Sequence, residues 1–357
     1  ITDSNLADND VLTITATTDI EELASIISGI ENIQLDITSF SDITADLTGL
    51  TGFGSTLSIR NLQSGGATGV TLNNVPSNLT VVASSGVTQN LTTNLEGKNI
   101  TIDGTNANTI TVTNIGSGGS SIIASDGTQI NMDGTNSTND QISISGSGVI
   151  SLETAHADQV EELYLSGKDS SVIYNLNAVD DAITHATLTG NQDTTLSLNV
   201  EQLTGLMIND ASEASATTTL LINNSGTADL SAINLDIIEL NDGSGAGSYT
   251  LSNQQSLRLS ADIAASGLTL NTASDTGSDI VTLEFGVSQT SGNIDVSTFE
   301  SVYLSTKNSS GISINQLTAG VNSTVFLTGE YQFTINDLTA SGIDASALES
   351  ALTTTLS

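Results

Sequence analysis

The side chains of this sequence best suited to bind a ligand are carboxylates that directly precede short segments of alternating apolar and polar residues. Asp10 stands before Val11, and Asp140 and Asp279 stand before similar segments. Such a polar turn offers carboxylate and backbone carbonyl oxygens, which are the ligands that Ca²⁺ prefers in proteins. We therefore predict structural calcium at the acidic turns. The candidate metal ligands are Asp8, Asp10, Asp103, Asp126, Asp133, Asn139, Asp140, Asp242, Asp275 and Asp279.

The same turns have a simpler interpretation, in which each Asp closes an ordinary Asx turn and its carboxylate is solvated. The charge balance bears on the choice. The 357 residues include 40 Asp and Glu but only 5 Lys and Arg, so the formal net charge is −35. Unpaired negative charges of this number repel one another unless cations screen or bridge them. The charge therefore favours calcium somewhere along the chain.

The composition also excludes several classes of protein. Five basic residues do not form the clusters that bind a phosphate backbone, so nucleic acid is not an expected partner. The chain contains no cysteine, which excludes disulfides and thiolate metal sites. No apolar run approaches the roughly 20 residues that span a bilayer as a helix.

One group of side chains has the types needed for acid–base catalysis. Asp180, Asp181 and His185 would suit glycoside hydrolysis if they converged on a substrate. The alternative is a polar turn or short helix on the surface. The basic residues are scattered, which argues against a site for acidic sugars. We predict no catalytic residues and expect that the chain is not an enzyme.

The elements that position these turns are predicted to be short strands. Ile, Val and Leu alternate with Thr, Ser and Asn over segments such as 11–15, 109–113 and 141–145. This period of two is typical of strands, and the breaks between segments are rich in Gly, Asn, Asp and Ser. Helical patterns are few, and residues 18–30, 177–186 and 344–352 are the candidates.

Internal repeats indicate how the strands are arranged. The segments 30–35, 160–165 and 299–304 share one opening pattern, in which Glu is the second residue. From residue 160 onward, strand centres recur about every 23 residues, which is typical of a β-solenoid. In the first half, residues 100–106 match residues 130–136, and three strands fit within that offset. We therefore predict three strands per coil there, each followed by a polar turn, which is the plan of a parallel β-helix.

We therefore predict an all-β fold, an elongated parallel β-helix or β-solenoid with short coils and few short helices. Residues 1–150 are expected to form a first solenoid part with coils rich in Ser, Thr and Asn. Residues 151–357 are expected to form a second part with repeats of about 23 residues. A row of small β-sandwich domains is the competing all-β arrangement, but such domains usually need an aromatic core anchor. Residues 100–160 contain no aromatic residue.

The opening at 160–165, the bulk of Ser, Thr and Asn, the absence of cysteine and the acidic turns together resemble surface-layer (S-layer) proteins of the RTX kind. The RTX nonapeptide is incomplete here: residues 243–251 keep its spacing with Ser248 in place of Asp, and residues 275–281 keep only its second half. The resemblance implies export by the type I route from a Gram-negative bacterium, calcium binding and assembly into a crystalline coat.

From these observations we expect a structural, self-assembling protein of the bacterial cell surface, located outside the cell and stabilised by calcium. Its expected partner is itself, in a two-dimensional lattice or multimer. Outer-membrane lipopolysaccharide is a further candidate partner, through the N-terminus or a region outside this segment. A type I-secreted calcium-binding adhesin or matrix protein is the alternative, and a β-helix enzyme acting on carbohydrate is a more distant one.

Overall fold

The computed structural model shows an all-β chain folded as a parallel β-solenoid, as predicted. The chain divides into two compact units, residues 1–195 with 210–216 (unit 1) and residues 196–209 with 217–357 (unit 2). The structure describes residues 10–21, 30–48, 50, 56–62, 69–84, 90–96, 98–135, 140–154, 160–178, 183–241, 247–262, 267–274, 277–290, 292–307 and 311–356.

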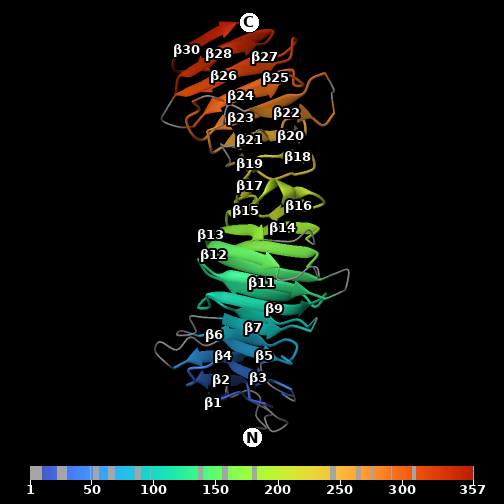
Figure 1. The fold of residues 1–357 in the computed structure, drawn as a ribbon, viewed down its shortest axis with the longest axis vertical. Coiled ribbons are helices and arrows are strands. Elements are labelled where there is room, and N and C mark those ends of the chain that lie inside the picture. The colour runs from blue at the N-terminus through green and yellow to red at the C-terminus, as the bar shows by residue number, and fades with distance from the viewer. Residues whose placement is uncertain are drawn as a thin grey trace. The chain divides into compact units, whose positions relative to one another are not determined.

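The strands of unit 1 succeed one another along the chain and form the successive coils of the solenoid (Figure 1). Its strands are β1 (Val11–Ala16), β2 (Asn32–Ile37), β3 (Ile43–Asp46), β4 (Thr56–Asn61), β5 (Val70–Asn73), β6 (Thr80–Ala83), β7 (Asn90–Asn94), β8 (Thr101–Asp103), β9 (Thr109–Ile115), β10 (Ser120–Ala124), β11 (Gln129–Gly134), β12 (Gln141–Thr154), β13 (Glu162–Ala178) and β14 (His185–Gly190).

Two strands, β15 (Thr194–Leu198) and β16 (Met207–Ser212), contain residues of both units. Unit 2 continues with the 3₁₀-helix η1 (Val200–Leu203), β17 (Thr218–Ile222), β18 (Thr227–Asp229), β19 (Ile237–Leu240), β20 (Gly247–Leu251), β21 (Ser256–Leu259), β22 (Leu268–Thr272), β23 (Ile280–Phe285), β24 (Gly292–Val296), β25 (Ser301–Thr306), β26 (Ile312–Ala319), β27 (Thr324–Gly329), β28 (Phe333–Thr339), β29 (Gly342–Leu348) and β30 (Leu352–Leu356).

Each coil contributes two strands, and equivalent strands of successive coils pair in parallel. In unit 2, one stack runs through β17, β19, β21, β23, β25, β27 and β29, and the other runs from β18 through β20 to β30. In unit 1, β8 pairs with β10, and β9 pairs with β11. Parallel strands need a connection that returns the chain to the same end, and the opposite strand of the coil supplies it.

The prediction of three strands per coil in the first half was wrong. Ile102 pairs with Ile122, and Ile110 pairs with Ile130, so one coil is complete when the chain has passed from β8 through β9 to β10. The matching segments that begin at residues 100 and 130 are therefore one and a half coils apart. They lie in different stacks, in β8 and in β11. Similar sequences recur because strands of both stacks need the same alternation of apolar and polar residues, followed by a polar turn.

Coils of unit 2 vary in length. The chain advances by 18 residues from Leu220 to its partner Ile238, by 26 from Leu257 to its partner Leu283, and by 21 from Leu283 to its partner Leu304. The additional residues lie in the corner segments between strands, because the paired strands keep a continuous register. The division expected at residue 150 falls inside β12, which pairs with β10 before that residue and with β11 after it.

The helix predicted at residues 344–352 was wrong, because β29 covers most of this segment. Val325 pairs with Ile343 and Phe326 with Asp344, so pairing with the preceding coil overrides local helix propensity. For the candidate at residues 18–30, residues 22–29 lie outside the described part of the chain. The candidate at 177–186 has strand at both ends, in β13 and β14, while residues 179–182 lie outside the described part.

The core consists of columns of aliphatic side chains that point inward from successive coils. Leu257, Leu283, Leu304 and Leu327 form one such column in unit 2, and each is at most 1% exposed. Outward neighbours such as Thr282 are half-buried. Phe285 of β23 meets Phe333 of β28 edge to face at 6.1 Å between ring centroids, which joins the two stacks across the core.

We expect Leu283→Ala to lower the free energy of unfolding by about 3 kcal/mol, because it removes a fully buried side chain with coils on both sides. Thr282→Ala, one residue away on the outward face, serves as the control and is expected to change it by less than about 0.5 kcal/mol. Urea denaturation followed by circular dichroism measures both. Equal effects of the two substitutions would contradict the inward and outward assignment.

Candidate functional site

Two of the predicted metal ligands, Asp140 and Asp279, are fully buried at the points where β12 and β23 begin. In each case the backbone N–H donates to a Glu carboxylate on the next coil. The Asp140 N lies 2.7 Å from Glu161 Oε2, and the Asp279 N lies 2.7 Å from Glu300 Oε2. The backbone carbonyls of the two Asp residues accept N–H groups from the same coil in return. Each Asp and Glu pair therefore joins two coils.

A third copy of this arrangement lies in unit 1. The Asp10 N donates to Glu31 Oε2 at 2.9 Å, and the Asn32 N donates to the Asp10 carbonyl at 3.0 Å. In all three copies the Glu has the same offset in sequence from the Asp and is the second residue of the repeated opening. The acidic turns and the repeated opening therefore belong to one structural arrangement.

The side chain of Asp140 accepts hydrogen bonds from Thr135, the residue that follows β11. Thr135 donates its hydroxyl to the carboxylate at 2.8 and 2.9 Å, and the Thr135 backbone N–H donates to the same carboxylate. Asp133-Gly134-Thr135 has the same sequence as Asp103-Gly104-Thr105. The Thr105 hydroxyl donates to Asp103, whereas the Thr135 hydroxyl donates to Asp140. These contacts satisfy a buried carboxylate without a metal ion.

The remaining described candidates are dispersed. Asp103 ends β8 and accepts from the hydroxyl of Thr105 at 2.9 Å, which is an Asx turn. Asp126 Oδ1 accepts from the N–H of Val149 on the next coil at 2.8 Å. Asp133 is half-buried near the end of β11. The candidates that lie outside the described residues are Asp8, Asn139, Asp242 and Asp275.

Asx turns of the type Asp-x-Ser/Thr recur along both units, and the sequence analysis did not single them out. In Asp229-Leu230-Ser231 the carboxylate accepts from the Ser231 N at 3.0 Å and from its hydroxyl at 2.6 Å. A search for Asp followed two residues later by Ser or Thr would have found them. The other turns with this carboxylate contact begin at Asp46, Asp103, Asp210, Asp295 and Asp344.

Several of these turns stabilise the ionised carboxylate. The pKa of Asp46 lies below its ordinary value because the Thr48 hydroxyl, the Asn74 amide and the Thr48 N–H donate to it. The Ser231 hydroxyl and N–H lower the pKa of Asp229 in the same way. Hydrogen bonds that favour the charged form therefore keep these groups ionised at neutral pH.

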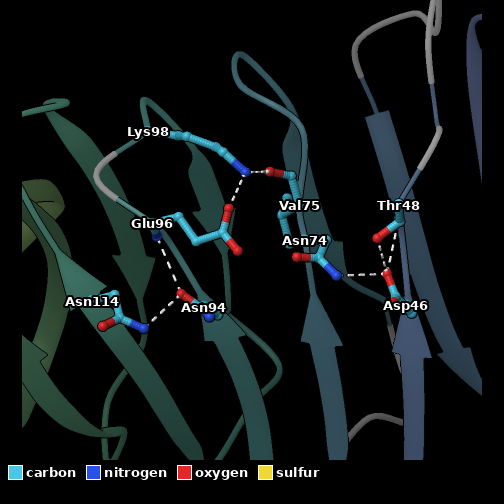
Figure 2. A network of polar contacts seen from close by, with 8 residues as sticks. All are labelled: Asp46, Thr48, Asn74, Val75, Asn94, Glu96, Lys98 and Asn114. Carbon is cyan, nitrogen blue, oxygen red and sulfur yellow. Dashed lines mark hydrogen bonds and ion pairs between the residues drawn. The ribbon is translucent and has the colours of Figure 1, made fainter.

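A corner of unit 1 shows how polar side chains link coil to coil (Figure 2). Asn74 donates to Asp46 Oδ1 at 2.8 Å, and Asn114 donates to Asn94 Oδ1 at 3.0 Å. Lys98 reaches back to the Val75 carbonyl at 3.0 Å. Asn74 and Asn114 have φ of 55° and 52°, a left-handed conformation that asparagine tolerates well. These contacts tie the ends of β3 and β5, and of β7 and β9.

Most of the positive charge is already paired with carboxylates of the same unit. Arg60 binds Asp36 through two hydrogen bonds, at 2.9 and 2.7 Å, and lowers the pKa of that carboxyl. Lys98 pairs with Glu96. The fifth basic residue of the chain, Lys168, is exposed and has no ion-pair partner among the described residues.

In unit 2, Arg258 lies between Glu239 and Glu284 of the neighbouring coils, and Lys307 pairs with Glu284 at 2.7 Å. Burial raises the pKa of Glu284, but hydrogen bonds from Lys307 and Arg258 outweigh burial, so this pKa lies below its ordinary value. Because these cations are paired with carboxylates of their own unit, the many other carboxylates dominate the charge of the chain.

Calcium binding imposes a geometric condition on the candidate ligands. The ion takes six to eight oxygen ligands, and several must converge on one point. Within the described ranges, no three Asp, Glu or His side chains lie together in this way. The carboxylates of Asp103, Asp126 and Asp140 instead accept hydrogen bonds from Thr105, Val149 and Thr135.

The acid–base group considered in the sequence falls only partly within the described residues. His185 begins β14, and its Nδ1 lies 2.9 Å from the Thr184 hydroxyl. Asp180 and Asp181 lie outside the described part of the chain.

The chain was compared with known families, curated proteins and solved structures. No protein-family model, curated protein or solved structure matches it. A search of the described residues for a helix with the length and apolar character to cross a bilayer found none.

We expect Glu161→Ala to lower the free energy of unfolding by about 2 kcal/mol, because it leaves the buried N–H of Asp140 unpaired. Glu162→Ala is the matched control, since the adjacent Glu162 binds only the half-buried Tyr164 hydroxyl. Denaturant titration of both variants gives the comparison. If the control is as destabilised as Glu161→Ala, the link between the coils is not the cause.

The lowered pKa of Asp46 predicts how stability depends on pH. A carboxyl whose pKa falls on folding contributes stability above its unfolded value, about 3.9, and loses it as the pH falls through the folded value. The difference in unfolding free energy between the native chain and Asp46→Asn should therefore be constant above about pH 5 and shrink below about pH 4. Denaturation measured from pH 3 to 7 tests this. A difference that grows on acidification would refute the assignment.

Proposed function

We propose that this chain is a structural protein that assembles with copies of itself into an extracellular layer on the bacterial cell surface, of the S-layer kind. The observation that carries the proposal is the use of the polar side chains. Asp, Glu, Asn and Thr side chains mainly link one coil to the next, as in the pair of Asp140 and Glu161 and in the corner of Asp46 and Asn74. This is the chemistry of a scaffold, and the proposal assigns no catalytic site to it.

The outward faces of the coils support this role. Thr80, Thr101 and Ser121 are register partners on β6, β8 and β10, and Ser121 donates to the Thr101 hydroxyl at 3.1 Å. Neighbouring strands are about 4.8 Å apart, so such columns repeat one polar group at a fixed spacing. A face built from repeats offers many equivalent contact points, which suits packing in a regular array.

The net negative charge of the chain is the reason for the proposed dependence on calcium. Arg60, Lys98, Arg258 and Lys307 already bind carboxylates of their own unit, so copies of the chain meet as strongly anionic bodies. Repulsion between them is long-ranged at low salt and falls when divalent cations gather at the surface. The proposed cation is calcium, acting between carboxylates of the exterior rather than in one preformed cluster. Anionic lipopolysaccharide would need the same bridging cations.

We expect calcium at a few millimolar to convert the purified protein into ordered sheets or multimers and to raise its melting temperature, with a chelator reversing both. Sodium chloride of matched ionic strength is the control, because general screening alone should be weaker than bridging by divalent ions. Negative-stain imaging, sedimentation and thermal denaturation provide the readouts. A protein that stays monomeric, with the same melting temperature in calcium and in chelator, would refute the proposal and leave an adhesin as the better candidate.

A further inference from the structure

One outward face of unit 2 carries two stacked aromatic rings. Tyr303 of β25 and Phe326 of β27 are register partners on successive coils. Their ring centroids lie 4.6 Å apart, and the ring planes differ by 11°. Both side chains are half-buried and alternate along their strands with fully buried neighbours such as Val302 and Val325. The two rings therefore point away from the core, where they can contact a ligand.

The outer face of Phe326 is directed toward the next coil. Tyr303 covers one face of the Phe326 ring, so the opposite face lies on the side of β29. The residues of β29 that pair with this part of β27 are Gly342, Asp344 and Ala347. All three have side chains shorter than phenylalanine. The outer part of the ring face therefore extends beyond its neighbours in β29.

Hydroxyl groups flank the rings along both strands. They belong to the outward residues two positions before and after each ring, and all are half-buried: Ser301, Ser305, Thr324 and Thr328. Strands rise about 3.3 Å per residue, so each hydroxyl-bearing residue lies about 6.6 Å along the strand from the ring-bearing residue. A Cβ added at Gly342 would meet Thr324 Oγ1 at 3.8 Å, an ordinary contact distance. Space therefore remains beside this hydroxyl, which can both donate and accept.

A carboxylate lies next to the outer face of Phe326. Asp344 is the register partner of Phe326 and is exposed. Its Oδ1 accepts from the Ser346 N–H at 2.9 Å. The Ser346 hydroxyl and N–H lower the pKa of Asp344, so the group is ionised at neutral pH. A carboxylate has about four lone-pair sites, so Asp344 can accept further hydrogen bonds from a ligand.

These groups together suit a sugar. Ligand sites combine apolar surface with a few placed polar groups. A pyranose ring of a β-linked glucan has C–H groups on its faces, which stack on an aromatic ring, and hydroxyls around its edge, which donate and accept. An anionic sugar is disfavoured by Asp344 and by the net charge of −35. The hydroxyls on both sides of the ring favour a ligand that carries hydroxyls over a simple cation.

We propose that the outer face of Phe326 binds one pyranose ring of a neutral β-linked glucan, with a sugar hydroxyl donating to Asp344. Thr324 and Thr328 flank the same ring and exchange hydrogen bonds with neighbouring sugar hydroxyls. Tyr303 is a positioning residue, because it stacks on the opposite face of Phe326. This binding goes beyond the proposed structural function, since it requires neither a lattice nor calcium.

The first test uses the full chain and cellohexaose in a chelator-containing buffer at about 0.1 M salt, which separates binding from calcium-dependent assembly. Saturation-transfer NMR detects sugar protons that contact the protein. We expect saturable transfer to the ring C–H protons. Phe326→Leu keeps an apolar side chain but removes the ring, and should weaken binding at least tenfold. Circular dichroism checks that this variant is folded.

Tyr164→Leu is the matched control for the loss of an outward aromatic ring. Tyr164 is half-buried on β13 of unit 1, and its hydroxyl donates to Glu162. The variant should bind cellohexaose within about twofold of the native chain. Asp344→Asn keeps the shape of the side chain but removes its charge, and should weaken binding about fivefold.

A second readout uses the absence of tryptophan from the chain. Phe326→Trp introduces a single indole at the proposed site, and Tyr164→Trp introduces one at the control position. Cellohexaose should shift the emission of the first indole and protect it from quenching by acrylamide, and should leave the second unchanged.

Three results would overturn the proposal. The first is the absence of saturation transfer from the native chain to cellohexaose. The second is an equal effect at the two positions, either in the leucine variants or in the tryptophan variants. The third is protection of the indole of the Phe326→Trp variant by an arginine-containing peptide but not by cellohexaose, which would identify a cation as the ligand.

Discussion

The backbone N–H groups at the corners of the coils impose the main constraint on this structure. Within the strands, each coil pairs with the coil before and the coil after, but at a corner this ladder stops. A buried N–H without an acceptor costs about 1–3 kcal/mol, so each corner needs one. At the buried Asp140, Glu161 supplies it to the coil before, and Asp126 accepts from the more exposed Val149 N–H of the coil after. Backbone carbonyls of the neighbouring coil accept many other corner N–H groups, and the carboxylates add to them at particular corners.

The electrostatic character of the protein follows from that use of carboxylates. A carboxylate that accepts a hydrogen bond from a backbone N–H retains its full negative charge. The N–H groups at the corners are therefore hydrogen-bonded while the surface stays anionic. Arg258, between Glu239 and Glu284, shows the other solution, in which one cation joins three coils. Because such cations are rare in the chain, the proposed assembly relies on divalent cations supplied by the solution.

The start of the stack at β18 illustrates a different constraint. An edge strand with free backbone groups invites pairing with other chains, and proteins commonly limit this with charge. Here the helix η1 packs beside β18, and the exposed carboxylate of Asp229 adds negative charge to the same strand.

The sequence alone determined the fold class, because alternation with a period of two and a recurring strand spacing are local properties that a parallel solenoid requires. It also determined that Glu31, Glu161 and Glu300 are equivalent, since they share one opening. Only the tertiary structure decided how many strands complete a coil, because the repeat that relates 100–106 to 130–136 spans one and a half coils rather than one. It also decided that residues 342–348 form a strand and what Asp140 contacts. The residue that lies beside a given carboxylate on the next coil depends on the total length of the loops that separate the two residues in sequence. A local sequence pattern does not contain that total.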